Sequence, residues 1–296
     1  MPSLKEVRNR ISSVNSTQQI TKAMKMVAAA KLKRAQDNIL KIRPYAEKLS
    51  GILRNISSSM DSSGADNIFA AKREIKNVLI IVITSDRGLA GAFNANVIKA
   101  TTALVLEKYA DLDAKGKVTF LCVGKKGLDF FSKRNSPVIS DYVGAFQSIN
   151  FEKVRPIAEF AMNGFSTEVY DSVEIVYNEF KNVASQIVRK AQFLPIENAE
   201  VESTVKNTSE VDFIYEPSKE FIVKELIPKS LKIGFYKALL ESNASEHGAR
   251  MTAMDKATDN AKELLKELRL SYNRSRQAAI TKEILEIVGG AEALKG

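Results

Sequence analysis

The chain of 296 residues is 45% hydrophobic, has no tryptophan and carries a net charge of +9, and its low aromatic content of 7% suits long helices better than a sheet sandwich. Its single cysteine, Cys122, excludes an intrachain disulfide, and its single histidine, His247, argues against a zinc site. No apolar run reaches the length of about 18 residues that spans a membrane, and the N-terminus has no signal-peptide pattern.

The basic charge is concentrated in the first 59 residues. They hold twelve Lys and Arg against three acids, and twelve minus three equals the whole net charge of nine. Such a segment favours an acidic protein surface, a phosphate backbone or an anionic membrane. A basic coiled-coil nucleic-acid binder is therefore one hypothesis, although the cations are not interleaved with aromatic residues as nucleic-acid binders often arrange them.

Residues 3–59 show the three-four spacing of a coiled-coil helix. If continuous, these 57 residues would span roughly 85 Å at about 1.5 Å each, although Pro44 is expected to kink or end the helix. Apolar or small residues hold the register at Leu4, Val7, Ile11 and Val14, and again at Ala28, Leu32, Ala35, Ile39, Ile42, Ala46, Leu49, Leu53 and Ile56.

The register turns polar between these two halves, at Gln18, Thr21 and Lys25. The apolar residues of the same stretch lie on a neighbouring face, at Ile20, Met24 and Val27. We expect the polar seam to weaken self-packing here, and one cause would be a different neighbour at this level.

The middle of the chain predicts a Rossmann-like α/β domain. Residues 60–76 are polar and glycine-containing, which is typical of a linker. Helical patterns cover 95–109, the stretch after Gly124, and 151–167. Strand-like runs are Val78–Ile83, Lys117–Val123, Val138–Ile139, Val173–Glu179 and Ile187–Leu194, the last two forming an antiparallel hairpin.

The C-terminal part reads as a second long helix that begins at Pro217–Ser218 and is interrupted early by Pro228. Gly289–Gly290 should loosen its last turns. A first apolar stripe contains Met254, Ala257, Ala261, Leu264 and Leu268, and a second contains Ile280, Ile284, Ile287, Ala291 and Leu294. The face therefore changes near Ser271–Thr281.

The predicted fold class is α/β plus long helices: an antiparallel coiled coil of the two ends with an inserted Rossmann-like domain. The predicted segments are the N-terminal helix 1–59, the linker 60–76, the α/β domain 77–216 and the C-terminal helix 217–296.

One loop has the position of a phosphate site, because Thr84–Asn94 follows a buried strand and opens a helix. Its glycines match neither common nucleotide-binding motif, so a structural turn is the favoured interpretation and a nucleotide-binding enzyme the alternative. Gly124–Gly127 is interpreted as a basic surface turn. Cys122 is expected to be buried and His247 to pack or face solvent, and no cofactor or metal is predicted.

Four stretches together resemble the gamma subunits of F-type ATP synthases. They occur in the family's order over the whole chain: Ile20–Ala30, Thr84–Gly91, Glu246–Met254 and Ser275–Ile284. The resemblance implies a non-catalytic rotor of the central stalk that couples proton flow to ATP synthesis or hydrolysis. Its partners would be three alpha and three beta subunits, the epsilon subunit and the membrane c-ring, with no nucleic acid and no small-molecule substrate of its own.

The resemblance also implies roles for particular residues. It implies that seven residues couple rotation to the ring and contact the beta subunits: Met24, Lys25, Arg250, Arg276, Gln277, Thr281 and Glu283. A bearing tip falls to Ile284, Ile287, Val288 and Leu294. The chain lacks the cysteine-bearing insert of chloroplast forms and a transit peptide, which favours a bacterial protein on the cytoplasmic face of the inner membrane. We further expect the two breaks in the coiled-coil register to lie at similar height.

Overall fold

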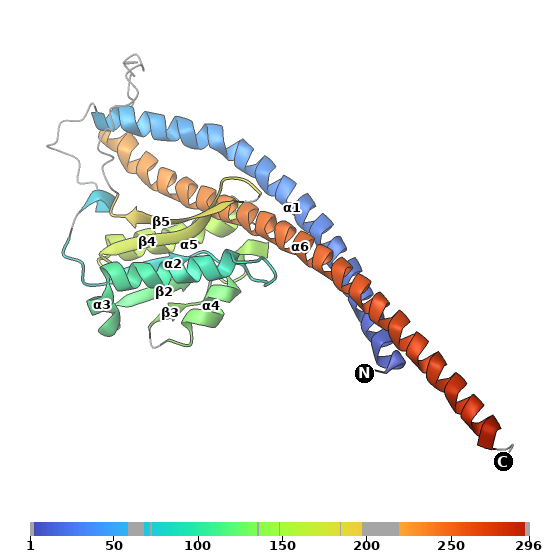
Figure 1. The fold of residues 1–296 in the computed structure, drawn as a ribbon. Helices are drawn as coiled ribbons and strands as arrows, with labels where there is room; N and C mark the ends of the chain where they lie inside the picture. Colours follow the sequence, from blue (N-terminus) through green and yellow to red (C-terminus); the bar gives the residue numbers. More distant parts are fainter. Residues whose placement is uncertain are drawn as a thin grey trace. The chain divides into compact units, whose positions relative to one another are not determined.

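The computed structural model describes residues 3–58, 68–71, 73–134, 136–147, 149–183, 185–196 and 219–293 (Figure 1). Most of the predicted linker, the expected helix start at Pro217–Ser218 and Leu294 lie outside these residues. The chain divides into two compact units. We call Met1–Ala29 with Arg250–Gly296 the coil unit, and Ala30–Ala249 the α/β unit.

Five strands form one sheet with the order β3-β2-β1-β4-β5. The first four are parallel, and β5 pairs antiparallel with β4. The strands are β1 (Val78–Val82), β2 (Val118–Cys122), β3 (Val138–Ile139), β4 (Ser172–Phe180) and β5 (Gln186–Leu194). All five predicted strands are confirmed, and β1 is buried on both faces as its unbroken apolar run predicts.

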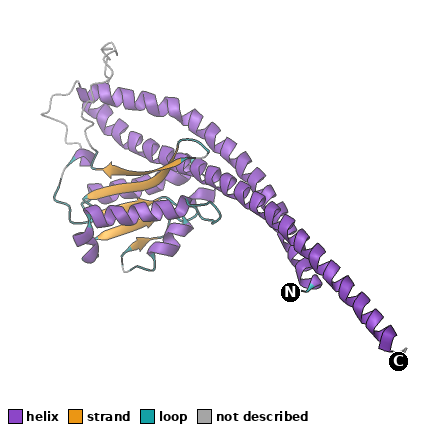
Figure 2. Ribbon diagram, viewed as in Figure 1, coloured by secondary structure: helices purple, strands orange, loops and turns teal. Residues whose placement is uncertain are grey.

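Helices cover both faces of the sheet (Figure 2). On one face, Val78 and Ile80 pack with residues of α2 (Phe93–Lys108), α3 (Ala110–Ala114) and α4 (Lys125–Phe131). On the other face, Leu79 and Ile81 pack with α5 (Phe151–Ser166).

The C-terminal helix also contributes to the second face. Phe235 and Leu239 of α6 (Lys219–Ala293) are fully buried in the same cluster as α5. The α/β core therefore includes part of a helix that the sequence assigned to the coiled coil.

The two long helices pass through their prolines. The helix α1 (Leu4–Ser58) contains Pro44, so it does not end there. The predicted interruption at Pro228 is wrong, because α6 runs through it. A helix-interior proline costs about 3 kcal/mol. The half-buried Leu231 and the fully buried Phe235, one and two turns later, hold this segment in place. Within the described residues, no helix has the length and hydropathy needed to cross a membrane.

Candidate functional site

Side-chain contacts fix an antiparallel register in the coil unit. Lys25 Nζ lies 2.5 Å from Asp255 Oδ1, and the Arg8 guanidinium donates a hydrogen bond of 3.0 Å to the Tyr272 hydroxyl. The two α1 residues are 17 positions apart, and so are their α6 partners, since 25 − 8 and 272 − 255 both equal 17. The ends of the chain therefore pair head to tail, as predicted.

The predicted heptad of α1 is confirmed by burial. Every predicted position from Leu4 to Leu49 is buried or half-buried. On α6 the prediction is partly wrong, because Leu265 is buried and Leu264 is exposed. The observed α6 positions are Met254, Thr258, Ala261, Leu265, Leu268, Tyr272 and Ser275.

The polar stretch of α1 does not interrupt the register. Thr21 is only 9% exposed, and its hydroxyl oxygen accepts a hydrogen bond of 2.8 Å from the Thr258 hydroxyl. Lys25 one turn later pairs with Asp255, and polar pairs at such positions specify the register of a coiled coil. The expectation of weakened self-packing here is wrong, because the facing helix supplies polar partners at these positions.

Apolar side chains of the same stretch point to solvent instead. Ile20 is 59% exposed and Val27 is 56% exposed, and both lie on the neighbouring face predicted from the sequence. Met26 is also largely exposed and Met24 is half-buried. This face is therefore an apolar stripe on a basic helix, in a position to contact another protein.

The two breaks in the apolar register lie at different heights, so the expectation of similar height is wrong. The stretch around Lys25 faces Asp255, whereas Tyr272 faces Arg8, close to the start of α1. The apolar face of α6 changes near Ser271–Thr281 because the register brings it to the end of its partner helix.

The residues implied by the resemblance form two groups on the coil unit. The first group is Met24, Lys25 and Arg250. Lys25 pairs with Asp255, and Asp255 lies five positions after Arg250 on α6. Arg276 follows Arg250 by 26 positions, which is roughly 39 Å along a helix. Gln277, Thr281 and Glu283 accompany it and are exposed. The structure therefore does not gather these residues into one site.

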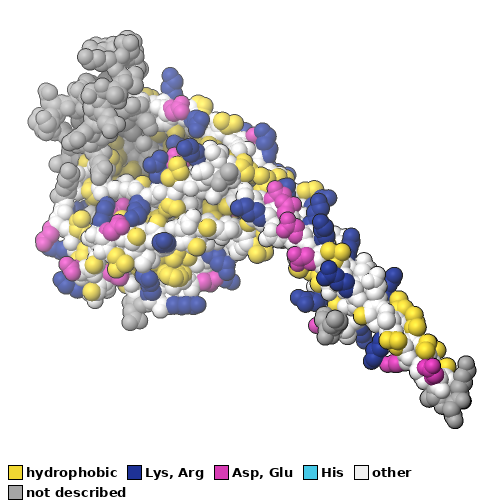
Figure 3. All heavy atoms as spheres, viewed as in Figure 1, with side chains coloured by type: hydrophobic (Ala, Val, Ile, Leu, Met, Phe, Trp, Pro, Cys, Tyr) yellow, Lys and Arg dark blue, Asp and Glu magenta, His cyan; other side chains and the backbone are white. Residues whose placement is uncertain are grey.

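The end of α6 forms an exposed apolar surface. Figure 3 shows hydrophobic side chains gathered along the helix before its C-terminus. Their exposed fractions lie between 46% and 67%, at Ile280, Ile284, Leu285, Ile287 and Val288. Leu285 was not among the predicted tip residues, although its position beside Ile284 was a sufficient signal.

The exposed contact between Arg8 and Tyr272 changes the pKa of the tyrosine. The hydrogen bond from the Arg8 guanidinium lowers the pKa of the Tyr272 hydroxyl, and the positive charge of Arg8 acts in the same direction. Neither residue was singled out from the sequence, because 264 positions separate them.

Polar groups of the Thr84–Asn94 loop accept hydrogen bonds from the N-terminus of α4. Asp86 Oδ1 accepts from the Lys125 backbone N–H, and Thr84 Oγ1 accepts from the Gly127 N–H at 2.9 Å. The Lys126 N–H donates to the Ser85 carbonyl. The N-terminus of α4 is thus capped by the loop, which leaves these donors unavailable to a phosphate.

Close packing explains the glycines of the neighbouring turn. A Cβ on Gly124 would lie 2.0 Å from the Thr84 carbonyl oxygen, and one on Gly127 would lie 2.9 Å from Thr84 Oγ1. The interpretation of Gly124–Gly127 as a basic surface turn is therefore wrong for its glycines, which are buried at the start of α4. Cys122 is buried as predicted, and burial raises the pKa of its thiol to about 12. His247 is 9% exposed, which places it among the packed residues.

Comparison with known proteins identifies the family. A family model described as ATP synthase matches residues 3–294. The ATP synthase gamma chain of Cytophaga hutchinsonii is 66% identical over 294 residues, covering 99% of both chains. The chain belongs to the ATP synthase gamma chain family.

Other relatives agree with this membership. The gamma chain of Flavobacterium psychrophilum is 55% identical over 296 residues, covering 100% of both chains. A chain from the central stalk and c-ring structure of Tetrahymena thermophila mitochondrial ATP synthase is 28% identical with a TM-score of 0.56, covering 80% of this chain and 99% of its own. A chain from the Euglena gracilis mitochondrial ATP synthase shares the fold, with 23% identity and a TM-score of 0.63 over 98% of this chain and 94% of its own.

The gamma chain is therefore a peripheral, non-catalytic subunit of ATP synthase and belongs to the central stalk, the rotor. The antiparallel pairing of its ends around an α/β insertion is the fold that the sequence resemblance implied.

Proposed function

We propose that this gamma chain couples proton flow to ATP synthesis or hydrolysis by rotating inside a ring of three alpha and three beta subunits. The observation that supports this is the coil unit, whose two antiparallel helices are joined by polar pairs at the level of Lys25 and leave Ile20 and Val27 of the same stretch exposed. Two paired helices resist twisting better than one, and an outward apolar stripe is suited to contact with surrounding subunits. Epsilon and the c-ring are the further proposed partners.

We assign the coupling and beta-contact role to Met24, Lys25, Arg250, Arg276, Gln277, Thr281 and Glu283, and the bearing tip to Ile284, Ile287, Val288 and Leu294. Lys25 would act chiefly by holding the helix that carries Met24, since its ammonium group pairs with Asp255. The predicted segments 1–59, 60–76, 77–216 and 217–296 remain our division of the chain. We place the complex on the cytoplasmic face of the bacterial inner membrane.

Reconstitution tests this function. Alpha and beta subunits mixed with this chain are expected to hydrolyse ATP faster than alpha and beta alone, and the chain is expected to co-purify with them. Equal hydrolysis without the chain, or no co-purification, would contradict the proposal.

A substitution at Met24 tests the proposed contact. Met24→Lys adds a cation to an already basic surface, and we expect it to pair with acidic groups of the ring and hold the rotor in one orientation. A bias of about 1.4 kcal/mol toward one orientation changes its occupancy tenfold. Fewer protons pumped per ATP are expected in membrane vesicles. Leu40→Lys, at an exposed position of α1 outside this stripe, is the matched control. Equal losses in both variants would contradict the role proposed for Met24.

A further inference from the structure

The ligand-binding position of the α/β sheet lies where the strand connections reverse. The connections from β1 to β2 and β3 proceed in one direction, and the connection through α5 returns to β4 on the other side of β1. In open α/β sheets, ligands bind at such a switch point, outside the carboxyl ends of the strands. Here that position lies beyond Val82 and Val176, which are paired residues of β1 and β4.

Residues of α6 occupy this position. Ala249 packs with Ala90 and Phe93, all of them at most 9% exposed. The Ser245 hydroxyl donates a hydrogen bond of 3.2 Å to the Asn178 carbonyl, and the Asn178 side-chain amide donates one of 3.2 Å to the Phe93 carbonyl. A continuous polar link therefore joins the start of α2, the end of β4 and α6.

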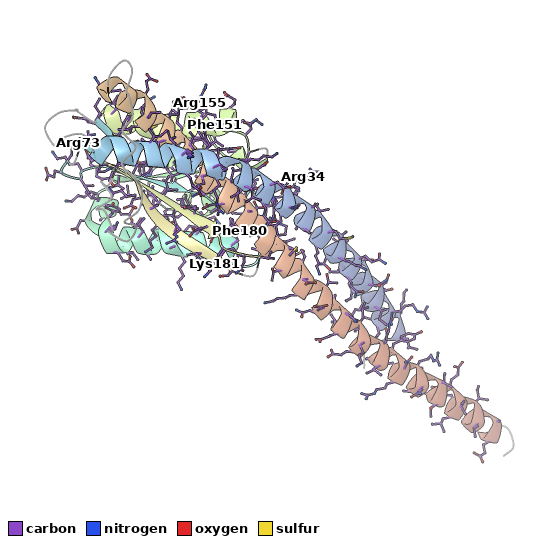
Figure 4. The ribbon with its side chains drawn as sticks, turned by 90° about the horizontal axis from the view of Figure 1, so that it is seen from above. Arg34, Arg73, Phe151, Arg155, Phe180 and Lys181 are labelled. Atoms are coloured by element: carbon purple, nitrogen blue, oxygen red, sulfur yellow. The ribbon has the colours of Figure 1, made fainter. Side chains whose placement is uncertain are left out.

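Small side chains allow this close approach. A Cβ on Gly248 would lie 3.5 Å from Phe180 Cε2 and 3.6 Å from the Val183 carbonyl oxygen. Figure 4 shows Phe180 and Lys181 at the end of β4, beside α6. Ser242 and Ser245 are fully buried on the same helix.

Larger groups fix the preceding turns of α6. Lys232 Nζ pairs with Glu159 of α5 at 2.7 Å, and the Phe151 and Tyr236 rings meet edge to face with centroids 5.7 Å apart. Phe235 packs against Phe193 of β5. These contacts hold α6 on the sheet face. The hydrogen bonds of Ser245 and Asn178 add a directional constraint, because a hydrogen bond is satisfied only in a narrow range of orientations.

We infer that the switch-point crevice of this α/β fold has become the seat of its own rotor helix, with Ser245, Gly248 and Ala249 acting as positioning residues through which the α/β unit turns α6. This α6 seat comprises these three residues with Ala90, Phe93, Asn178 and Phe180. The inference rests on the proposed rotary function, because the orientation of α6 on the sheet must be fixed about the helix axis only if the α/β unit turns this helix. Helix α6 continues without interruption from the seat to Ala293, and in this inference that continuity passes a turn made at the seat to the residues that follow.

The first test compares two buried serines in complete ATP synthase reconstituted in vesicles. Ser245→Ala removes the hydrogen bond to Asn178, whereas Ser242 Oγ is buried with no hydrogen-bond partner among the described residues. We expect Ser245→Ala to pump about two- to fivefold fewer protons per ATP hydrolysed than Ser242→Ala, with ATP hydrolysis itself maintained. Equal pumping by both variants would overturn the inference.

The second test adds bulk to the seat. Gly248→Leu would crowd Phe180 and is expected to lower pumping per ATP about tenfold, as overpacking displaces the helix. Gly234→Leu is the control, since a Cβ at Gly234 meets nothing within 4 Å. Phe180→Ala added to Gly248→Leu should restore part of the pumping. Equal effects at both glycines, or no rescue, would contradict the seat.

The outcomes separate the two proposals. Absence of ATP-driven pumping with the unaltered chain would reject the rotary function. Normal pumping by the unaltered chain with no difference between the matched variants would reject the seat alone.

Discussion

At the scale of residues, the coil unit depends on polar pairs that join distant parts of the sequence. Thr21 and Thr258 occupy facing core positions of the heptad that apolar residues fill elsewhere, and Lys25 pairs with Asp255 at the half-exposed edge of the same contact. Apolar contacts tolerate sliding because they lack direction, whereas a hydrogen bond or ion pair is satisfied in one register. We therefore attribute the alignment of the two helices to these pairs.

A charge exchange tests this alignment. Lys25→Asp and Asp255→Lys each place like charges together, and each is expected to lower the free energy of unfolding by about 0.5 kcal/mol, since both side chains are 40–50% exposed and screened. The double exchange should recover most of this loss in urea unfolding. The same exchange at Lys33 and Asp37, an exposed pair within α1, is the control. A double exchange no more stable than the single variants would contradict the pairing.

Gly124 carries a second residue-scale prediction. Gly124→Ala would place Cβ 2.0 Å from the Thr84 carbonyl oxygen, so β2 and the loop must separate. We expect a loss of about 3 kcal/mol or more in unfolding free energy. Gly88→Ala, whose Cβ would meet Lys126 Cε at 3.9 Å, should cost far less. Denaturant unfolding of both variants measures the difference, and similar losses would refute the packing argument.

At the scale of elements, the sequence predicted secondary structure well and helix contacts less well. The strand at Val78–Val82 could be predicted from the sequence alone, because a strand buried on both faces requires a continuous run of apolar residues. The continuation of α6 through Pro228 could not be predicted in this way, because it depends on packing against α5 and the sheet. Leu264 and Leu265 are equally apolar, and only the register with α1 decides that Leu265 is buried.

The same limit applies to the candidate site. The exposed stripe at Ile20 and Val27 was visible in the heptad, since these residues stand outside it. The partners of Thr21 and Lys25 were not, because they lie 237 and 230 positions away. A polar residue in a heptad looks like a break until the residue opposite is known.

A buried tyrosine links two elements of the α/β unit and predicts a pH dependence. The Tyr109 hydroxyl at the end of α2 donates to Glu174 of β4, and Lys108 pairs with the same carboxylate. Burial raises the pKa of Tyr109 from 10 to about 12, and the charge of Glu174 also raises it. The fold therefore favours the neutral phenol. This contribution is fully present below pH 10 and is lost as the pH rises to about 12.

Tyr109→Phe removes this titration. The decline in urea midpoint between pH 10 and pH 12 should be shallower than in the unaltered chain, with part remaining because burial also raises the pKa of Tyr177 to about 12. Tyr45→Phe on the exposed face of α1 is the control. An unchanged decline in Tyr109→Phe would show that Tyr109 does not contribute.

At the scale of the whole molecule, the coil unit and the α/β unit differ in what they contribute to a rotor. The coil unit buries apolar heptad residues between its helices, adds polar pairs at Thr21 and Lys25, and leaves a separate apolar stripe exposed. The apolar end of α6 extends past its partner helix. The α/β unit incorporates Phe235, Leu239 and Ser245 of α6 into its own packing. A single continuous helix thus contributes residues to both units, and it is the element through which we infer that the α/β unit turns the shaft.

Rotation of this chain is the most direct measurement of the central claim. A bead attached through Lys181→Cys, an exposed position at the end of β4, reports the motion of the α/β unit when alpha and beta subunits are fixed to a surface. We predict that ATP addition turns the bead continuously in one direction and that rotation stops when ATP is removed. ATP hydrolysis at full rate with a stationary bead would contradict the account.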